Sequence, residues 1–413
     1  MMIVALGLLG FPAAAFALTI GSETILKGSD VTNGDRVGDS LAADGDTIVA
    51  GGPLDDQLGM NAGVIYVFAQ SGSIWSQQAK ITAPVTPTTH EFDLFGFAVD
   101  IDGDTLVATA PGTDVGAEPG AGAAYVFVRT GTTWSLQATL AEAGVSDIDS
   151  YGISVAISGD TIAIGASNSV PGFATGPGAV YVYTRTGSTW TKQATLSPSD
   201  GDDGDLFGRR LALDGDELMT DALYHLDGTE AIGDFSPLAP GTVYVFNRTG
   251  SVWNQTAKLV ADDRATAQGQ AFGDSISLDG GTAAFGAPVS GEAASFGGAV
   301  YVFTKTGATW SQAAKLTASD AAVGDSFGGT VALLGNILAV GADGFSVPLG
   351  GANPEGAAYV FERSGTWSQQ AKLLPSVLVP DIQFGGNVAV GVDYLAAAAP
   401  HAGGASPGVV DIG

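Results

Sequence analysis

Short runs of apolar residues recur along this chain, and within them apolar positions alternate with polar ones or follow one another directly. The clearest copy has such runs at 151–157, 161–166, 178–183 and 189–196. Val, Ile, Thr and Tyr are frequent in these runs, and the intervening Gly159-Asp160 and Thr186-Gly187 pairs suit hairpin turns. No stretch shows the 3.6-residue period of an amphipathic helix. The pattern predicts an all-β chain whose repeating unit has four short strands, here called strands a to d.

The repeating unit has a period in the fifties, which its tryptophans mark. They are Trp75, Trp134, Trp190, Trp253, Trp310 and Trp367, and 56 to 63 residues separate each from the next. An aromatic residue followed by glycine opens each copy, at Phe95-Gly96, Tyr151-Gly152, Phe207-Gly208, Phe272-Gly273, Phe327-Gly328 and Phe384-Gly385, with a weaker Val37-Gly38 before them. Repeats of this length are typical of propeller blades. Seven starts, near residues 37, 95, 151, 207, 272, 327 and 384, predict seven antiparallel blades.

The last copy is incomplete. It supplies strands at 385–390, 394–399 and 409–412 but no strand that carries a tryptophan. A shift of 290 residues places 19–27 on the fourth strand of the preceding copy, with Ile20 on Trp310 and Leu26 on Leu316. We therefore expect a seven-bladed β-propeller of four-stranded antiparallel blades, closed by the N-terminal strand, which completes the last blade and removes an open sheet edge.

These motifs resemble the FG-GAP repeat family, which builds the seven-bladed propeller of integrin α subunits. The Phe-Gly pairs carry the resemblance, together with strand ends such as Gly286-Ala287-Pro288 and Ala398-Ala399-Pro400. The family's calcium-binding loops between strands a and b are absent, because tight turns such as Asp44-Gly45-Asp46 stand in their place. The resemblance implies a binding or adhesion-like propeller, and no cofactor is expected with certainty.

Composition narrows the possible partners and the location of the protein. The formal charge is −28, so we expect neither nucleic acid nor an anionic membrane as a partner, because both attract basic surfaces. The chain has no cysteine, so it forms no disulfide. The apolar segment 1–17 ends in Ala15-Phe16-Ala17, typical of a cleaved signal peptide, so that 18–413 forms a single propeller domain. We expect a secreted or cell-surface protein, extracellular or periplasmic, monomeric, and not inserted in a membrane after cleavage.

The sequence favours a binding module over an enzyme. The a–b and c–d turns are short, whereas the b–c and d–a connections, which leave the opposite face, are long, variable and acidic. His90, His225 and His401 lie in separate connections without metal-ligand spacing and are expected to be solvated. We expect a protein or glycan ligand on the b–c and d–a face and no catalysis. The alternative is the propeller of a polysaccharide-active enzyme, sialidase-like or lyase-like.

Blade four carries the candidate site residues. Arg209 and Arg210 follow its Phe-Gly pair, and Tyr224 and His225 lie in its long b–c connection. The arginines either bind an anionic group of a ligand or form an internal ion pair with an aspartate such as Asp205. The linker before this blade carries four carboxylates, at Asp200, Asp202, Asp203 and Asp205, which predict either a Ca²⁺ site or a solvated acidic turn.

Overall fold

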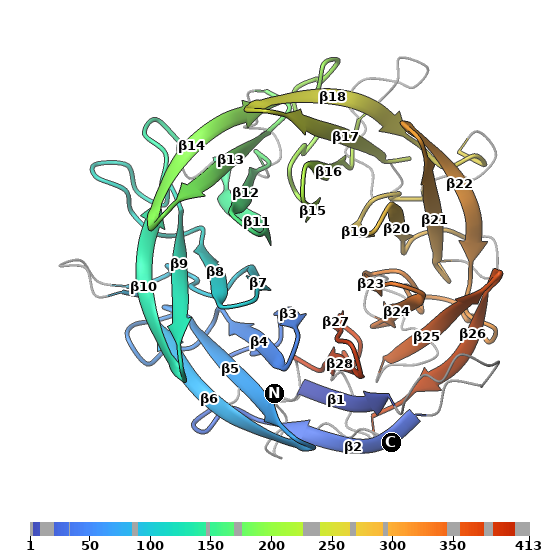
Figure 1. The fold of residues 1–413 in the computed structure, drawn as a ribbon, viewed down its shortest axis with the longest axis horizontal. Helices are drawn as coiled ribbons and strands as arrows, with labels where there is room; N and C mark the ends of the chain where they lie inside the picture. The colour runs from blue at the N-terminus through green and yellow to red at the C-terminus, as the bar shows by residue number, and fades with distance from the viewer. Residues whose placement is uncertain are drawn as a thin grey trace.

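The computed structural model describes residues 3–8, 20–32, 34–84, 90–145, 149–168, 176–225, 240–264, 270–291, 296–344, 356–375 and 383–400. Its strands form four-stranded antiparallel sheets arranged as a ring (Figure 1). Strand a of each sheet lies nearest the centre of the ring and strand d lies at its rim. The all-β class and the propeller arrangement expected from the sequence are confirmed.

Six blades are each built from one continuous segment in the strand order a-b-c-d. Blade 1 contains β3 (Ser40–Asp44), β4 (Thr47–Gly52), β5 (Val64–Ser71) and β6 (Ile74–Thr82). Blade 2 contains β7 (Val99–Asp102), β8 (Thr105–Ala110), β9 (Ala123–Thr130) and β10 (Thr133–Leu140). Blade 3 contains β11 (Tyr151–Ser158), β12 (Thr161–Ala166), β13 (Ala179–Thr186) and β14 (Thr189–Leu196).

The other three blades repeat this plan. Blade 4 contains β15 (Leu211–Asp214), β16 (Glu217–Ala222), β17 (Thr242–Thr249) and β18 (Val252–Leu259). Blade 5 contains β19 (Ser275–Asp279), β20 (Thr282–Ala287), β21 (Ala299–Thr306) and β22 (Thr309–Leu316). Blade 6 contains β23 (Thr330–Leu334), β24 (Ile337–Ala342), β25 (Ala357–Ser364) and β26 (Thr366–Leu373).

The prediction of seven blades is wrong, because the structure has six blades of this kind. The copy that starts at Phe384 contributes only β27 (Asn387–Val390) and β28 (Tyr394–Ala398) among the described residues. These pair with β1 (Ile3–Leu8) and β2 (Ile20–Leu26) in the order β2-β1-β28-β27, which we call the composite sheet.

The closure of the ring also differs from the prediction. β2 takes the outermost place as expected, but its neighbour is β1, from the segment assigned to a signal peptide. An open edge on β28 requires a partner, and the apolar, β-branched sequence of β1 supplies one in antiparallel register. The strand expected at 409–412 and the cleavage motif at 15–17 lie outside the described residues. Among the described residues no helix is long and apolar enough to cross a membrane.

Neighbouring blades pack through the aromatic residues of the Phe-Gly pairs. Phe95 is fully buried and packs between strands of blades 1 and 2, and Phe327 does the same between blades 5 and 6. The glycine near the end of strand b permits this close contact, since a Cβ on Gly51 would lie 1.9 Å from the Gly96 carbonyl oxygen of the next blade. The repeated small residues therefore set the spacing of the ring.

Candidate functional site

Arg209 and Arg210 lie just before β15, at the inner end of blade 4. The Arg209 guanidinium pairs with the Asp274 carboxylate of blade 5, and its Nε lies 3.3 Å from Asp221 Oδ2. Arg210 Nε donates to the Asp274 carbonyl oxygen at 2.8 Å, and its backbone N–H donates to Asp221 Oδ1 at 2.6 Å. The arginines therefore take part in an internal ionic network between blades 4 and 5. Its carboxylates are Asp221 and Asp274, not the Asp205 suggested by the sequence.

Burial controls the electrostatics of this network. Asp221 is fully buried, and desolvation raises its pKa to about 6 although Arg209 and its hydrogen bond to Arg210 act against the shift. Desolvation also acts to raise the pKa of Asp274, but Arg209 and Arg210 outweigh it and hold the pKa below its ordinary value. Two cations and two anions balance, so the network joins the blades without a net charge.

Comparison with the other blades shows what the network replaces. At the position of Arg210, four blades have a hydroxyl that donates to the Phe-Gly carbonyl oxygen of the next sheet: Ser40 to Gly96 at 2.7 Å, Ser154 to Gly208 at 2.7 Å, Ser275 to Gly328 at 2.9 Å and Thr330 to Gly385 at 3.1 Å. Each of these hydroxyls faces a strand-b glycine, whose place Asp221 takes in blade 4. Arg210 therefore also donates a hydrogen bond to a backbone carbonyl oxygen of the next blade, but through a longer side chain. Sequence reasoning missed the pairing role of Asp221 and Asp274.

His225 is buried, with 2% of its surface exposed, so the expectation of a solvated loop histidine is wrong. Its Nδ1 lies 2.7 Å from Asp205 Oδ2, and its Nε2 lies 2.8 Å from Lys258 Nζ. The Tyr224 backbone N–H donates to the Asp205 carbonyl oxygen at 3.2 Å. His90 is also buried and contacts Asp93, while His401 lies outside the described residues. The contacts of His225 and Tyr224 with Asp205 join the b–c connection of blade 4 to the linker that precedes the blade.

The four carboxylates of the candidate calcium loop have different protein partners. Asp200 accepts from Tyr244 at 2.8 Å and from Lys258 at 2.9 Å, and Asp203 accepts the Gly176 N–H at 2.7 Å. Asp205 binds His225, and its carboxylate also accepts the Asp202 N–H at 2.8 Å. In the described parts of the chain no group of three or more His, Asp or Glu side chains is placed to hold a metal ion. Calcium binding at this loop stays a prediction.

The position of Asp200 recurs in other copies. Equivalent contacts of a carboxylate with a tyrosine and a lysine join Asp30 to Tyr66 and Lys80, Asp263 to Tyr301 and Lys315, and Asp320 to Tyr359 and Lys372. In each set the lysine also lies over the tyrosine ring, 5.0 to 5.7 Å from its centroid. Asp200 is therefore explained by the repeat, which accounts for one of the four carboxylates without a metal.

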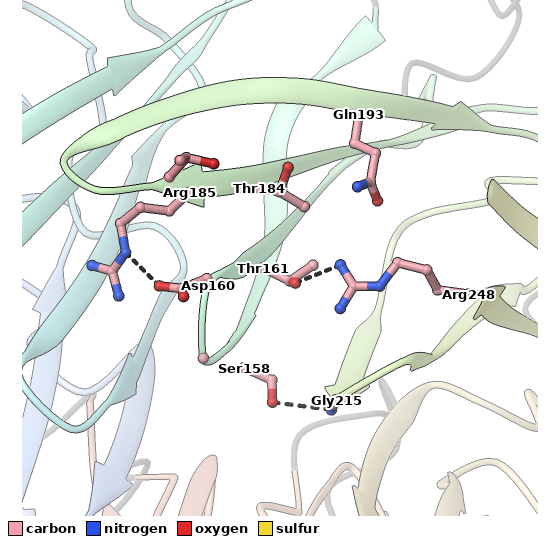
Figure 2. A pocket seen from close by; sticks show the side chains of 10 residues that line it. Ser158, Asp160, Thr161, Thr184, Arg185, Gln193, Gly215 and Arg248 are labelled. Carbon is pink, nitrogen blue, oxygen red and sulfur yellow. Dashed lines mark hydrogen bonds and ion pairs between the residues drawn. The ribbon is translucent and has the colours of Figure 1, made fainter. Parts of the chain in front are cut away.

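A polar pocket of about 500 Å³ lies between blades 3 and 4 on the face formed by the a–b and c–d turns, which we call the turn face. Figure 2 shows Arg185 and Arg248 approaching it from opposite sides. Arg185 Nε donates to Asp160 Oδ1 at 2.7 Å, Arg248 Nη1 donates to Thr161 Oγ1 at 2.9 Å, and the Gly215 N–H donates to Ser158 Oγ at 3.0 Å. The sequence analysis predicted no function for the residues that line this pocket.

The contacts that line this pocket recur at other junctions. Arg129 donates to Thr47, Arg185 to Thr105 and Arg363 to Thr282, each across to the preceding blade. The same arginines lie over the tryptophans of their own blades, 5.0 to 5.5 Å from the ring centroids. The charged lining of the pocket is thus part of an inter-blade contact that holds the ring together, and we assign it no ligand.

The tryptophans complete the junctions on the turn face. Trp134, Trp190 and Trp253 donate their indole N–H to Gln78, Gln137 and Gln193 of the preceding blade at 2.8 to 2.9 Å, and Trp310 donates to Glu217. Trp367 Nε1 is buried without a hydrogen-bond partner, and the aligned position in blade 5 is Ala313. Within the described part of the chain, the junction between blades 5 and 6 therefore leaves a buried indole N–H without an acceptor.

We expect Ala313→Gln to stabilise the protein by about 1 kcal/mol, because it supplies an acceptor to a buried N–H. Gln193→Ala should destabilise it by about 1–2 kcal/mol, since the Trp253 N–H then loses its partner. Urea unfolding measures both. Gln370→Ala is the control, because this residue is exposed and, among the described residues, its side chain donates to Ser368, two positions earlier. A loss of stability in Ala313→Gln would contradict the assignment.

Asp100 of β7 carries a pH-dependent contribution to stability. It accepts N–H groups from Ile157 of blade 3 at 2.7 Å and from Ile101 at 2.9 Å. Burial raises its pKa to about 7, although these two hydrogen bonds act in the opposite direction. The folded chain therefore keeps this proton up to higher pH than the unfolded chain. The stabilisation is complete below the unfolded pKa and is lost as pH rises towards 7.

We expect Asp100→Asn, which does not ionise, to reduce the fall in melting temperature between pH 5 and pH 8. Thermal unfolding at the two pH values measures the difference. Asp46→Asn is a matched control, because Asp46 is exposed and it accepts the Gln70 N–H through its backbone carbonyl oxygen. An unchanged pH dependence in Asp100→Asn would show that Asp100 is ionised throughout this range.

A comparison with known protein families identifies the same repeating unit as the sequence pattern does. A family model described as FG-GAP repeat matches residues 21–68, 75–127, 134–183, 190–246, 253–303 and 310–361. Each match starts in a fourth strand and ends in the third strand of the next blade, so the family unit spans a blade junction. No curated protein matches this sequence. Because the six segments cover well over half of the chain, the chain belongs to the FG-GAP repeat family.

Proposed function

We propose that the protein is a binding module, secreted or exposed at the cell surface, that recognises a protein or glycan in adhesion-like contacts. The ligand binds the face formed by the b–c and d–a connections, which we call the loop face. The family and the propeller fold support a binding module at this coarse level. The module performs no catalysis.

One observation carries the choice of face: the two faces differ in how strictly they repeat. On the turn face, four junctions share the arginine–threonine contact, and three of these also share the tryptophan–glutamine contact. On the loop face, corresponding positions carry different residues, such as the glycines 34, 204 and 324 but Phe92 in the second copy. A face that holds the ring together is constrained, whereas variable connections on a rigid scaffold suit ligand recognition.

The candidate site residues of blade 4 contact charged residues of the protein itself, which favours a structural role for them. His225, Asp205 and Lys258 contact one another, and Arg209 pairs with Asp221 and Asp274. No specific observation favours the alternative of a polysaccharide-active enzyme, and we do not propose it.

Glycan and matrix-protein arrays probed with the full chain test the proposal. A ligand selected on the array should lose at least about tenfold in affinity for the double variant Ala117→Lys and Glu118→Lys on the loop face. The matched variant Thr132→Lys and Ser188→Lys adds charge to exposed turns of the other face and should bind normally. Loss of binding only in the turn-face variant would contradict the proposal.

A further inference from the structure

Phe92 has a backbone conformation that its side chain disfavours. It lies three residues before the Phe-Gly pair of blade 2, with φ of 64°. At the equivalent position three other copies have glycine, Gly34 at 102°, Gly204 at 87° and Gly324 at 81°. Positive φ suits glycine because it has no Cβ, and a bulky residue there is an outlier. Blade 2 therefore has phenylalanine at a position where three other copies have glycine.

Burial does not compensate this strain. The Phe92 side chain is 49% exposed, and its backbone N–H donates to the carbonyl oxygen of Met60 at 2.7 Å. Met60 is 53% exposed, and Leu58, two residues earlier in the b–c connection of blade 1, is 43% exposed. We call these three residues the apolar ledge. Large exposed apolar residues gathered at one place mark an interaction site more often than scattered ones do.

The backbone beneath the apolar ledge is held by several contacts. The Leu94 N–H donates to the Asn61 carbonyl oxygen at 3.1 Å, and buried His90 Nδ1 lies 2.7 Å from Asp93 Oδ2. Gly112 of blade 2 packs so closely that a Cβ there would lie 1.8 Å from the Phe92 carbonyl oxygen. Strained residues persist where the surroundings over-determine them, and they cluster at binding sites. Phe92 is thus pre-organised, which lowers the entropy cost of binding.

Charge indicates the kind of partner. Exposed Asp56 and Glu91 lie in the same two segments as the apolar ledge, and the chain carries a formal charge of −28. A second copy of the chain would meet like charge, whereas a basic partner would meet complementary charge. We propose that the apolar ledge anchors a protein segment that presents an aliphatic or aromatic side chain beside a lysine or arginine. This inference rests on the proposed binding function of the loop face and names its partner class.

Phe92→Gly is the decisive variant, because it installs the residue that three other copies have and removes the anchor. We expect an unchanged or raised melting temperature, since glycine adopts this φ without strain. Random dodecapeptides displayed on phage and panned against the full chain provide the probe. Selected peptides should carry an apolar residue next to a Lys or Arg, and the resynthesised peptides should bind Phe92→Gly at least about tenfold more weakly.

Ile74→Ser is the control, because Ile74 is 70% exposed at a c–d turn on the opposite face. Its binding of the selected peptides should match that of the wild type, and higher salt should weaken binding to both. Peptides that bind Phe92→Gly and the wild type equally, or a panning without enrichment, overturn the inference. Suppose the peptides bind Phe92→Gly and the wild type equally, but do not bind the double variant Ala117→Lys and Glu118→Lys. The loop face then still binds a ligand, so the proposed function stands and the role of the apolar ledge is refuted. If only Ile74→Ser abolishes binding, both fail.

Discussion

Deletion of residues 1–8 is expected to lower the melting temperature sharply, because it removes an interior strand of the composite sheet. β1 pairs with β2 on one side and with β28 on the other. Without β1, β2 has no neighbour in its sheet and β28 has an open edge. At about 0.5–1.5 kcal/mol for each hydrogen bond, the loss of two strand pairings amounts to on the order of 5 kcal/mol or more. Thermal unfolding measures the effect.

A point substitution provides a milder form of this deletion. Ala5 pairs with Thr24 and with Ala396, so Ala5→Pro should destabilise in the same direction because proline cannot donate to the ladder. Ala5→Val is the matched control, since valine suits a strand.

The chain that starts at Leu18 separates two arrangements of the ring. It is the product expected from signal cleavage, and it lacks β1. If it melts as the longer chain does, then another segment completes the sheet, as the sequence predicts for 409–412. If it melts at a much lower temperature, then β1 is a necessary part of the ring.

The sequence predicted the blades well because their determinants are local. Alternating apolar residues, a Gly-Asp or Thr-Gly turn and an aromatic–glycine pair each act within a few residues, and each recurs at a fixed offset. The number of blades was predicted wrongly, and β1 was not expected in the sheet that closes the ring. The apolar run at 1–17 suits both a signal peptide and a strand, and apolarity alone does not distinguish them.

The candidate site shows a second reason for failure. Arg209 and Arg210 were singled out in the sequence, yet their pairing with Asp221 and Asp274 was missed. Asp274 lies 65 residues from Arg209 in the sequence, at the aligned position of the next copy. The contacts between side chains of two blades depend on how the sheets twist and pack. The residue spacing within one copy does not predict these contacts. His225 was likewise assigned to a solvated loop, because its partners Asp205 and Lys258 come from other segments.

Asp221→Ala is expected to destabilise the protein by about 3–5 kcal/mol, because it leaves the partly buried arginines without one of their two carboxylates. Asp221 is fully buried, and its Oδ1 also accepts the Arg210 N–H at 2.6 Å. Arg209→Gln should be destabilising for the same reason, since Asp221 and Asp274 then face each other with less compensation. Urea unfolding at neutral pH measures both variants.

Replacement of the whole network provides the control for this last prediction. The variant Arg209→Ile, Arg210→Ser, Asp221→Gly and Asp274→Gly installs residues that other blades use at the same positions. Its stability should lie within about 2 kcal/mol of the wild type, because buried ion pairs replaced as a set cost little, whereas a broken pair costs much. Near-wild-type stability of Arg209→Gln, with loss of affinity for the array-selected ligand, would instead identify Arg209 as a ligand-binding residue.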